Sequence, residues 1–283
     1  MTAQTQTQTR TLERPTIRPT SLVRQSWAIT RRNLIHIRRM PEMLLDVTLQ
    51  PVMFVLLFAY VFGGAIAVQG AADGYREWLL GGIMGQTMAF ASFIVAVGLT
   101  ADIDKGIVDR MRSLPIHLAA VLVGRSLSSL VHSSLGIVVM SLTGLVVGWR
   151  IRGSFLDAVL AYGLLVLWAF AMIWIGILVG STMRSVEAVN GVMFTVMFPL
   201  TFLSNAFAPT ERMPEVLRVF AEWNPISSLV QGVRELWGNT APAGPDAALP
   251  LQHPVLSTVI WCFGLTVVLA PLALGAFRRR TRD

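Results

Sequence analysis

Apolar residues in this chain stand in long blocks separated by short polar stretches, and they do not alternate at the period of a half-buried strand. A helix needs about 20 consecutive apolar residues to cross the hydrocarbon core of a bilayer, and each block is near that length. The pattern therefore predicts an all-α integral membrane protein with six transmembrane helices, within one domain over residues 22–280. The expected spans are residues 45–67, 78–100, 119–147, 155–180, 188–208 and 254–276.

The polar stretch before the first block divides into two parts. Residues 1–21 are rich in Thr and Gln and have little to bury, so we expect a disordered cytoplasmic tail. Residues 22–40 are amphipathic, which favours a helix in the headgroup layer of the membrane; a merely solvated charged segment is the alternative. The apolar face of such a helix would carry Val23, Trp27, Thr30, Leu34 and Ile37, and another face Arg24, Arg31 and Arg38.

The connection between the fifth and sixth blocks, residues 208–253, has helical signals of its own. Two stretches on either side of Asn224–Pro225 place apolar residues on one helical face. These residues are Val216, Phe220 and Trp223 in the first stretch, and Val230, Val233 and Trp237 in the second. We predict a short extracytoplasmic helical hairpin packed on the outer leaflet, followed by a Pro/Ala/Gly linker over residues 239–250.

Composition and charge support a membrane protein and argue against nucleic-acid binding. The chain of 283 residues is 54% hydrophobic and 14% charged, with a mean hydropathy of +0.61, whereas soluble chains average about 25% charged. The net charge is +7, and the basic residues that give it flank the apolar blocks and do not gather on one soluble basic face. Segments on the side of the termini hold 17 Lys and Arg, against six on the other side, which predicts cytoplasmic termini. Arg150 and Arg152 depart from this distribution, because they lie on the side opposite to the termini.

Few residues of the apolar blocks could carry chemistry. The single cysteine, Cys262, lies inside a block, so no internal disulfide can form, and the four histidines lack the spacing of metal ligands. His132 is the main ionisable residue within a predicted span, beside Ser129 and Ser133. An intramembrane ionisable group suggests a functional site. We therefore predict that these three residues line a transport path; a hydrogen-bonded packing role for His132 is the alternative.

The most charged short segment, Asp102–Leu114, lies between the second and third blocks on the predicted cytoplasmic side. Ile103, Ile107, Met111 and Leu114 recur at helical spacing, which predicts one amphipathic helix ending before Pro115. The opposite face mixes acidic and basic residues, and mixed charge suits docking against another protein better than binding lipid. A solvated loop without a partner is the alternative.

A magnesium–diphosphate site in the same segment is a weaker interpretation. Asp104 would point roughly 160° away from Asp102 on a helix, so the carboxylates would not converge. Lys105 and two neighbouring arginines would also compete with the metal. A membrane enzyme of that kind is therefore disfavoured.

Two stretches of the chain carry longer motifs. The first, Asp102–Ile116, begins with acid-x-acid-basic-Gly, and the second is Phe198–Leu236. Together they resemble the ABC-2 type permeases, in particular the daunorubicin/doxorubicin-resistance branch, although Asp104 stands where many relatives carry glutamate. The resemblance covers roughly residues 22–280. In the second stretch the family's pattern is matched by Pro199, Phe202, Ser204, Phe207, Pro209, Met213, Pro214, Asn224, Pro225 and Arg234.

The resemblance implies a pore-forming subunit, most simply a homodimer, driven by two separate ATPase subunits that dock on the cytoplasmic segment. ATP and Mg²⁺ would be bound by those partners, with no cofactor in this chain and no enzymatic activity of its own. The sequence agrees, because the only lysine, Lys105, is preceded by Asp-Ile-Asp and cannot belong to a P-loop. The coupling residues would be Asp102, Asp104, Lys105, Gly106, Ile107, Asp109, Arg110, Met111, Arg112 and Pro115.

The expected function is therefore export of a hydrophobic or amphipathic, drug-like compound across the cytoplasmic membrane of a bacterium. Export of a lipid or glycolipid remains open, since Trp-, Phe- and Met-rich spans suit these substrates equally. A secondary transporter is the alternative class, but it would normally show intramembrane carboxylates and paired broken helices.

Overall fold

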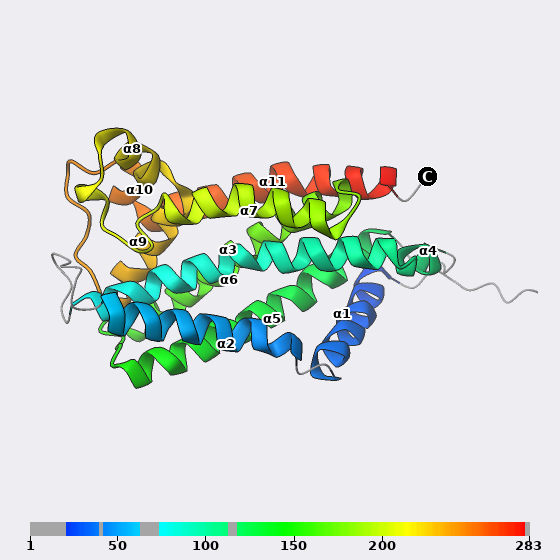
Figure 1. Cartoon of the computed structure of the whole chain (residues 1–283), viewed down its shortest axis with the longest axis horizontal. Helices are drawn as coiled ribbons and strands as arrows, with labels where there is room; N and C mark the ends of the chain where they lie inside the picture. The colour runs from blue at the N-terminus through cyan, green and yellow to red at the C-terminus, as the bar shows by residue number, and fades with distance from the viewer. Residues whose placement is uncertain (1–20, 40–41, 63–73, 113–117, 281–283) are drawn as a thin grey trace, which may run out of the picture.

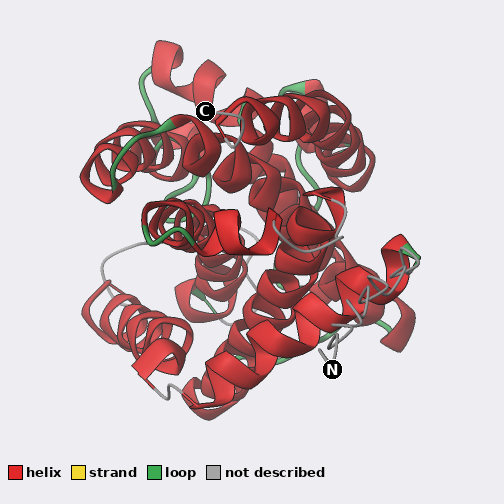
Figure 2. Cartoon of the chain, turned by 90° about the vertical axis from the view of Figure 1, so that its right-hand side faces the viewer, coloured by secondary structure: helices red, strands yellow, loops and turns green. Residues whose placement is uncertain are grey.

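The structure is a computed structural model that describes residues 21–39, 42–62, 74–112 and 118–280. Within these ranges the secondary structure is entirely helical (Figure 2). The elements are α1 (Leu22–Arg39), α2 (Glu42–Leu57), the π-helical η1 (Phe58–Phe62), α3 (Tyr75–Asp104), α4 (Ile107–Arg112), α5 (Leu118–Val147), α6 (Phe155–Thr182), α7 (Val186–Phe202), the 3₁₀ turn η2 (Thr210–Arg212), α8 (Glu215–Trp223), α9 (Pro225–Trp237), α10 (Leu249–Gln252) and α11 (Pro254–Arg280).

The long helices run side by side along the longest dimension of the molecule (Figure 1). Helices α3 and α6 form the centre and pack closely on each other. A Cβ atom on Gly176 would overlap the carbonyl oxygen of Ser92, and one on Gly180 would lie 2.7 Å from that of Ala96. These glycines on α6 therefore allow its backbone to approach α3, as small residues do between helices in membranes.

In the described part of the chain, four helices are long and apolar enough to cross a membrane, by length and composition: α3, α5, α6 and α11. The apolar windows of α3 and α6 are mostly buried, whereas that of α11 is mostly exposed. Large apolar side chains such as Val138 and Leu142 of α5 and Ile260 of α11 point out of the bundle. This outward apolar surface is the kind that lipid or another subunit covers.

The predicted spans and the observed helices agree in position but differ at their ends. Helices α5 and α6 match the predicted 119–147 and 155–180 within two residues, while α3 and α11 extend four residues past the predicted carboxyl ends. The first predicted span, 45–67, is divided between α2 and η1, and its last residues lie outside the described ranges. Residues 1–20 of the predicted tail also lie outside them.

The fifth predicted span, 188–208, is wrong at its carboxyl end because α7 stops at Phe202. Beyond that residue the chain turns back toward α9. The amide nitrogen of Asn224 donates hydrogen bonds to the carbonyls of Leu200 and Leu203, at 2.6 and 2.8 Å, and so satisfies groups that a helix end leaves open. Residues 203–208 are apolar enough to continue the fifth apolar block of the sequence, but their backbone forms this turn and does not continue α7.

The hairpin predicted between the fifth and sixth blocks is present as α8 and α9. Val216, Phe220 and Trp223 of α8 are all more than half exposed, whereas Val230, Val233 and Trp237 of α9 are completely buried. The two predicted apolar faces therefore exist but have different surroundings. Figure 1 shows α8, α9 and α10 at one end of the bundle, and α4 with the carboxyl end of α11 at the other.

Helix α1 is present as predicted and packs on α5, and its buried face combines Ile29 with polar residues. Ser26 and Thr30 are buried, and the Thr30 hydroxyl donates to the carbonyl of Gly124 at 3.1 Å. Val23 and Trp27 are 76% and 62% exposed. The placement of Thr30 on the membrane-facing side was therefore wrong, because this residue packs against α5, where its hydroxyl donates to the Gly124 carbonyl as well as to the Ser26 carbonyl of its own helix.

Candidate functional site

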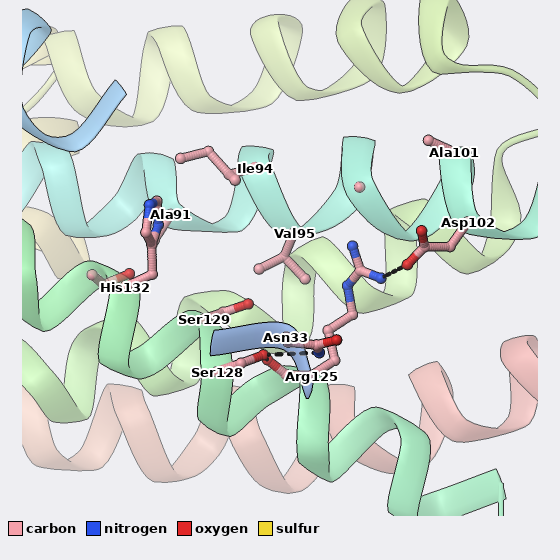
Figure 3. Close-up of a pocket in the computed structure, with 12 residues that line it drawn as sticks. Asn33, Ala91, Ile94, Val95, Ala101, Asp102, Arg125, Ser128, Ser129 and His132 are labelled. Atoms are coloured by element: carbon pink, nitrogen blue, oxygen red, sulfur yellow. Dashed lines mark hydrogen bonds and ion pairs between the residues drawn. The ribbon is translucent and has the colours of Figure 1, made fainter. Parts of the chain in front are cut away.

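A cavity of about 210 Å³ lies between α3 and α5, beside α1 (Figure 3). One wall is apolar and is formed by Ala91, Ile94 and Val95 of α3. The other wall, on α5, is polar, and Asn33 of α1 adjoins it. The full lining is Asn33, Ala91, Ile94, Val95, Gly98, Ala101, Asp102, Arg125, Ser128, Ser129, His132 and Ser133. A cavity with one apolar and one hydrogen-bonding wall suits an amphipathic ligand.

The structure brings all three residues of the predicted transport path into this cavity. Ser129, His132 and Ser133 lie on adjacent turns of α5, and His132 is 8% exposed. Four further polar residues line the cavity that sequence reasoning had not assigned to a transport path: Asn33, Ser128, Asp102 and Arg125. Asn33 is held by a hydrogen bond from its amide to the Ser128 hydroxyl, at 3.1 Å.

Asp102 and Arg125 form an ion pair across the two helices. Their side chains are 31% and 18% exposed. The guanidinium group reaches the carboxylate by passing over Gly98, where a Cβ atom would overlap Arg125 Nη2. Arg125 is a charged residue within the predicted span 119–147, and this is the sequence signal that could have found it.

The charged segment is not the single helix predicted over Asp102–Leu114. Helix α3 continues to Asp104, a turn follows at Lys105 and Gly106, and α4 begins at Ile107. Gly106 adopts a φ of +65°, in the left-handed region that favours glycine. Ile103 and Ile107 stand four residues apart, on either side of the break. This helical spacing in the sequence is why the pattern alone indicated one helix.

Asp104 contacts the carboxyl end of the last helix. Nη2 of Arg280 lies 3.3 Å from Oδ1 of Asp104, and Nη1 of the same arginine donates to the carbonyls of Gly180, at 3.0 Å, and Met183. The Thr100 hydroxyl also donates to the Gly180 carbonyl, at 3.0 Å. The end of α3, the α6–α7 connection and the end of α11 are thus joined at one point.

The remaining predicted coupling residues differ in how far they are exposed to solvent. Lys105 and Arg110 are exposed, and Ile107 is half-buried beside the buried Val108. A Cβ atom on Gly106 would meet nothing within 4 Å, so the turn presents open backbone. The side chains of Asp109, Met111 and Arg112, and the whole of Pro115, fall outside the described part of the structure.

At the opposite end of the bundle, Arg234 of α9 is completely buried. Its guanidinium donates to the carbonyls of Trp78, Asn205 and Ala206 at 2.7, 3.0 and 3.0 Å, and Cζ lies 3.4 Å from the centre of the Trp78 ring. Burial lowers the pKa of Arg234 well below its ordinary value. The three carbonyls and the ring oppose this by stabilising the charged form.

The glycines of α3 make room for this arginine. A Cβ atom on Gly81 would lie 2.9 Å from Arg234 Cγ, and one on Gly82 would overlap the carbonyl oxygen of Ala206. The predicted hairpin residues Arg234 and Asn224 therefore join α3, α7 and α9. Pro199 lies within α7, Pro209 and Pro214 precede η2 and α8, and Pro225 is the first residue of α9.

Arg152, which departed from the predicted charge distribution, has a partner at this end. Its Nε and Nη2 atoms lie 3.1 and 3.2 Å from the carboxylate oxygens of Glu77. Its backbone amide also donates to the carbonyl of Trp237 at 2.8 Å. The residue is thus part of the hairpin's packing, which gives it a structural reason to lie on this side.

The bundle of apolar helices, with a mixed polar and apolar cavity between two of them, defines a multi-pass membrane transport protein. The chain belongs to the ABC-2 type transporter family, whose profile matches residues 24–236. A member of this family is the permease, or membrane subunit, and is not itself the ATPase.

Several proteins are similar along most of the chain. The daunorubicin resistance ABC transporter permease protein DrrB1 of Streptomyces coeruleorubidus is 31% identical over 249 residues, which cover 88% of this chain and 84% of that protein. The probable doxorubicin resistance permease DrrC of Mycobacterium tuberculosis H37Rv is 24% identical over 239 residues, 82% of this chain and 80% of that protein. The putative transport permease ycf38 of Cyanophora paradoxa is 22% identical over 221 residues, 77% of this chain and 76% of that protein.

Proposed function

We propose that this chain is the membrane subunit of an ATP-driven exporter that moves an amphipathic, drug-like compound out across a bacterial cytoplasmic membrane. The observation that carries the proposal is the cavity between α3 and α5, which runs to the last turn of α3 immediately before α4. A substrate site and a docking segment for an energy-supplying partner are thus joined through one helix. The names of the resistance permeases above supply the class of compound.

The docking surface for the ATPase is the exposed part of the charged segment. Lys105, Gly106 and Arg110 face outward at the end of the bundle, and Ile107 seats α4 on α3. Asp102 and Asp104 have intramolecular partners, so their contribution to docking is to hold the segment in place. In this arrangement a movement of α4 would shift the last turn of α3. The ion pairs of Asp102 with Arg125 and of Asp104 with Arg280 connect that turn to the cavity wall and to α11.

The six-span topology with cytoplasmic termini belongs to this proposal. Helices α2 with η1 and α7 are shorter than the four long helices but run alongside them (Figure 1). Six crossings place α1, α4 and the end of α11 on the cytoplasmic side and the α8–α9 hairpin outside. A homodimer with two ATPase subunits completes the exporter, since one chain supplies half of a pore.

The decisive test is ATP-dependent transport by purified components. The tagged permease is isolated from its native membranes with its associated ATPase and reconstituted into vesicles. Daunorubicin serves as the fluorescent probe. We expect its accumulation to require ATP and to be lost on Ser129→Trp, which fills the cavity, while Val131→Trp on the exposed side of α5 retains it.

Other outcomes would replace one part of the proposal each. Accumulation that follows an ion gradient without ATP would replace the proposal by a secondary transporter. Movement of a fluorescent phospholipid, with none of daunorubicin, would replace the drug-like substrate by a lipid. Retained transport in Ser129→Trp would mean that the cavity is not the substrate site.

A further inference from the structure

We propose that Arg125, positioned by Gly98, forms with Asp102 the closed cytoplasmic boundary of the cavity, and that separating this pair opens it. The assignment of this end to the cytoplasm rests on the proposed function. The pair itself, its place in the cavity and its dependence on a glycine come from the contacts of α3 and α5. Neither Arg125 nor Gly98 carries a role in the coupling segment or in the predicted transport path.

The two residues mark the same end of the cavity. Along α3 the lining residues run from Ala91 to Asp102, about 16 Å at the rise of a helix. Along α5 they run from Arg125 to Ser133. The helices are antiparallel here, so the last lining residue of α3 lies opposite the first of α5, and Figure 3 shows the ion pair at the end away from His132.

The ion pair is the charged part of an otherwise neutral lining. Apart from His132, the other lining residues are apolar, amide or hydroxyl side chains. Both partners are partly buried, and a partly buried carboxylate or guanidinium is costly to leave without its partner. The closed arrangement is therefore favoured at rest, and opening requires water or a ligand to replace each partner.

Gly98 makes this geometry possible. A Cβ atom at that position would overlap Arg125 Nη2, so an alanine there requires the end of the arginine side chain to shift from the position in which it pairs with Asp102. The glycine therefore acts on the cavity boundary without carrying a charge. A substitution at Gly98 can therefore disturb the Asp102–Arg125 pair while both charged residues remain. It tests the geometry of the pair separately from its charges.

The pair is also placed to respond to the docking segment. Asp102 lies in the last turn of α3, two residues before the helix ends at Asp104, and Arg280 holds that same turn through Asp104. A rotation of the turn when α4 moves would withdraw the Asp102 carboxylate from Arg125. Docking and access to the cavity would then be linked by one turn of helix.

The test measures access to the cavity directly. A single cysteine is introduced as Ser129→Cys in a Cys262→Ala background, because Cys262 is the only native cysteine. Inside-out vesicles containing the permease without ATPase are treated with a cationic and with an anionic methanethiosulfonate. We expect slow labelling by both reagents. Arg125→Gln, Asp102→Asn and Gly98→Ala should each accelerate labelling by roughly tenfold, equivalent to about 1.4 kcal/mol in the opening equilibrium.

Two controls keep the result specific. Gly163→Ala places the same side chain at an α6 glycine whose Cβ would meet nothing, and it should leave the rate unchanged. The exchange of the two ions, Asp102→Arg with Arg125→Asp, should restore slow labelling. Because both reagent charges are used, a local change in potential would appear as opposite shifts, whereas opening accelerates both.

Equal labelling rates in all variants, or acceleration by only one reagent charge, would overturn the proposal. So would a charge exchange that labels as fast as the single variants while its elution profile on size exclusion stays native. These outcomes are independent of transport, since neither substrate nor ATPase is present. Failure of the daunorubicin assay with the expected labelling pattern would instead overturn the proposed function.

Discussion

Arg280 and Asp104 are 176 residues apart in the chain, and Nη2 of the arginine lies 3.3 Å from Oδ1 of the aspartate. The same guanidinium donates to the carbonyl of Gly180 at 3.0 Å. One side chain at the end of α11 therefore fixes the last turn of α3 and the end of α6. The segment that precedes α4 is tied to the bundle on this side by Arg280 and, through Asp102, on the other side by Arg125.

The Arg280 contact should matter for stability. Arg280→Ala removes an ion pair and the hydrogen bonds that Arg280 donates to the Gly180 and Met183 carbonyls, of which Gly180 keeps the Thr100 hydroxyl as a donor; the loss should cost about 1–2 kcal/mol. We expect a lower melting temperature for the detergent-solubilised protein. Arg279→Ala, at the exposed neighbouring residue, should melt like the wild type. Identical melting of both variants would mean that the Arg280 contacts do not stabilise the folded state.

Gly106 offers a test of why the turn before α4 needs glycine. Leucine at a φ of +65° costs about 1–2 kcal/mol, whereas asparagine tolerates this region. Gly106→Leu should therefore weaken ATPase binding by roughly 5- to 30-fold in a pull-down, and Gly106→Asn should retain most of it. Equal loss with asparagine would show that the partner needs open backbone there, and that conformational strain is not the cause.

The buried Arg234 should be among the most sensitive positions of the hairpin. Arg234→Met removes the hydrogen bonds that Arg234 donates to the carbonyls of Trp78, Asn205 and Ala206, and a buried carbonyl left without a donor costs about 1–3 kcal/mol. We expect little monodisperse protein after purification. Arg218→Met, at a half-exposed arginine of α8, is the matched control and should purify normally. Similar yields of both variants would contradict the structural role of Arg234.

Glu235 predicts a pH dependence of stability. Burial raises the pKa of its carboxyl, while hydrogen bonds from Gln231 and from the Ala243 backbone lower it in part. Because the pKa is raised in the folded state, folding favours the protonated carboxyl. The stability that protonated Glu235 contributes is fully present below its unfolded-state pKa of about 4.3, and it is lost as the pH rises through the folded-state pKa. Glu235→Gln should melt higher than the wild type at pH 8 and equally at pH 4. A variant that is less stable at pH 8 would reverse this sign.

The topology can be tested with single cysteines in the Cys262→Ala background. Lys105→Cys lies in the α3–α4 turn, and Asp246→Cys lies in the exposed linker before α10. We expect a membrane-impermeant maleimide to label only the second in intact cells and both in lysed cells. Labelling of Lys105→Cys from outside would reverse the orientation proposed from the charge distribution.

The sequence by itself determined where the helices lie. Apolar blocks of a certain length can satisfy their backbone in a membrane only as helices, so α3, α5, α6 and α11 follow from local pattern. The amphipathic α1, α8 and α9 follow in the same way from spacing along the chain. The Ser129–His132–Ser133 group could be named because an ionisable residue within an apolar block is exceptional.

Only the tertiary structure decided which residues meet. The pairs Asp102–Arg125 and Asp104–Arg280 depend on how α3 is rotated against α5 and α11, which no single helix specifies. The early end of α7 depends on long-range contacts with Asn224 that compete with local helical preference. The burial of Arg234 depends on glycines in a different helix. Helical periodicity is a property of neighbouring residues, whereas the cavity and its boundary are made by side chains that the packed bundle brings together.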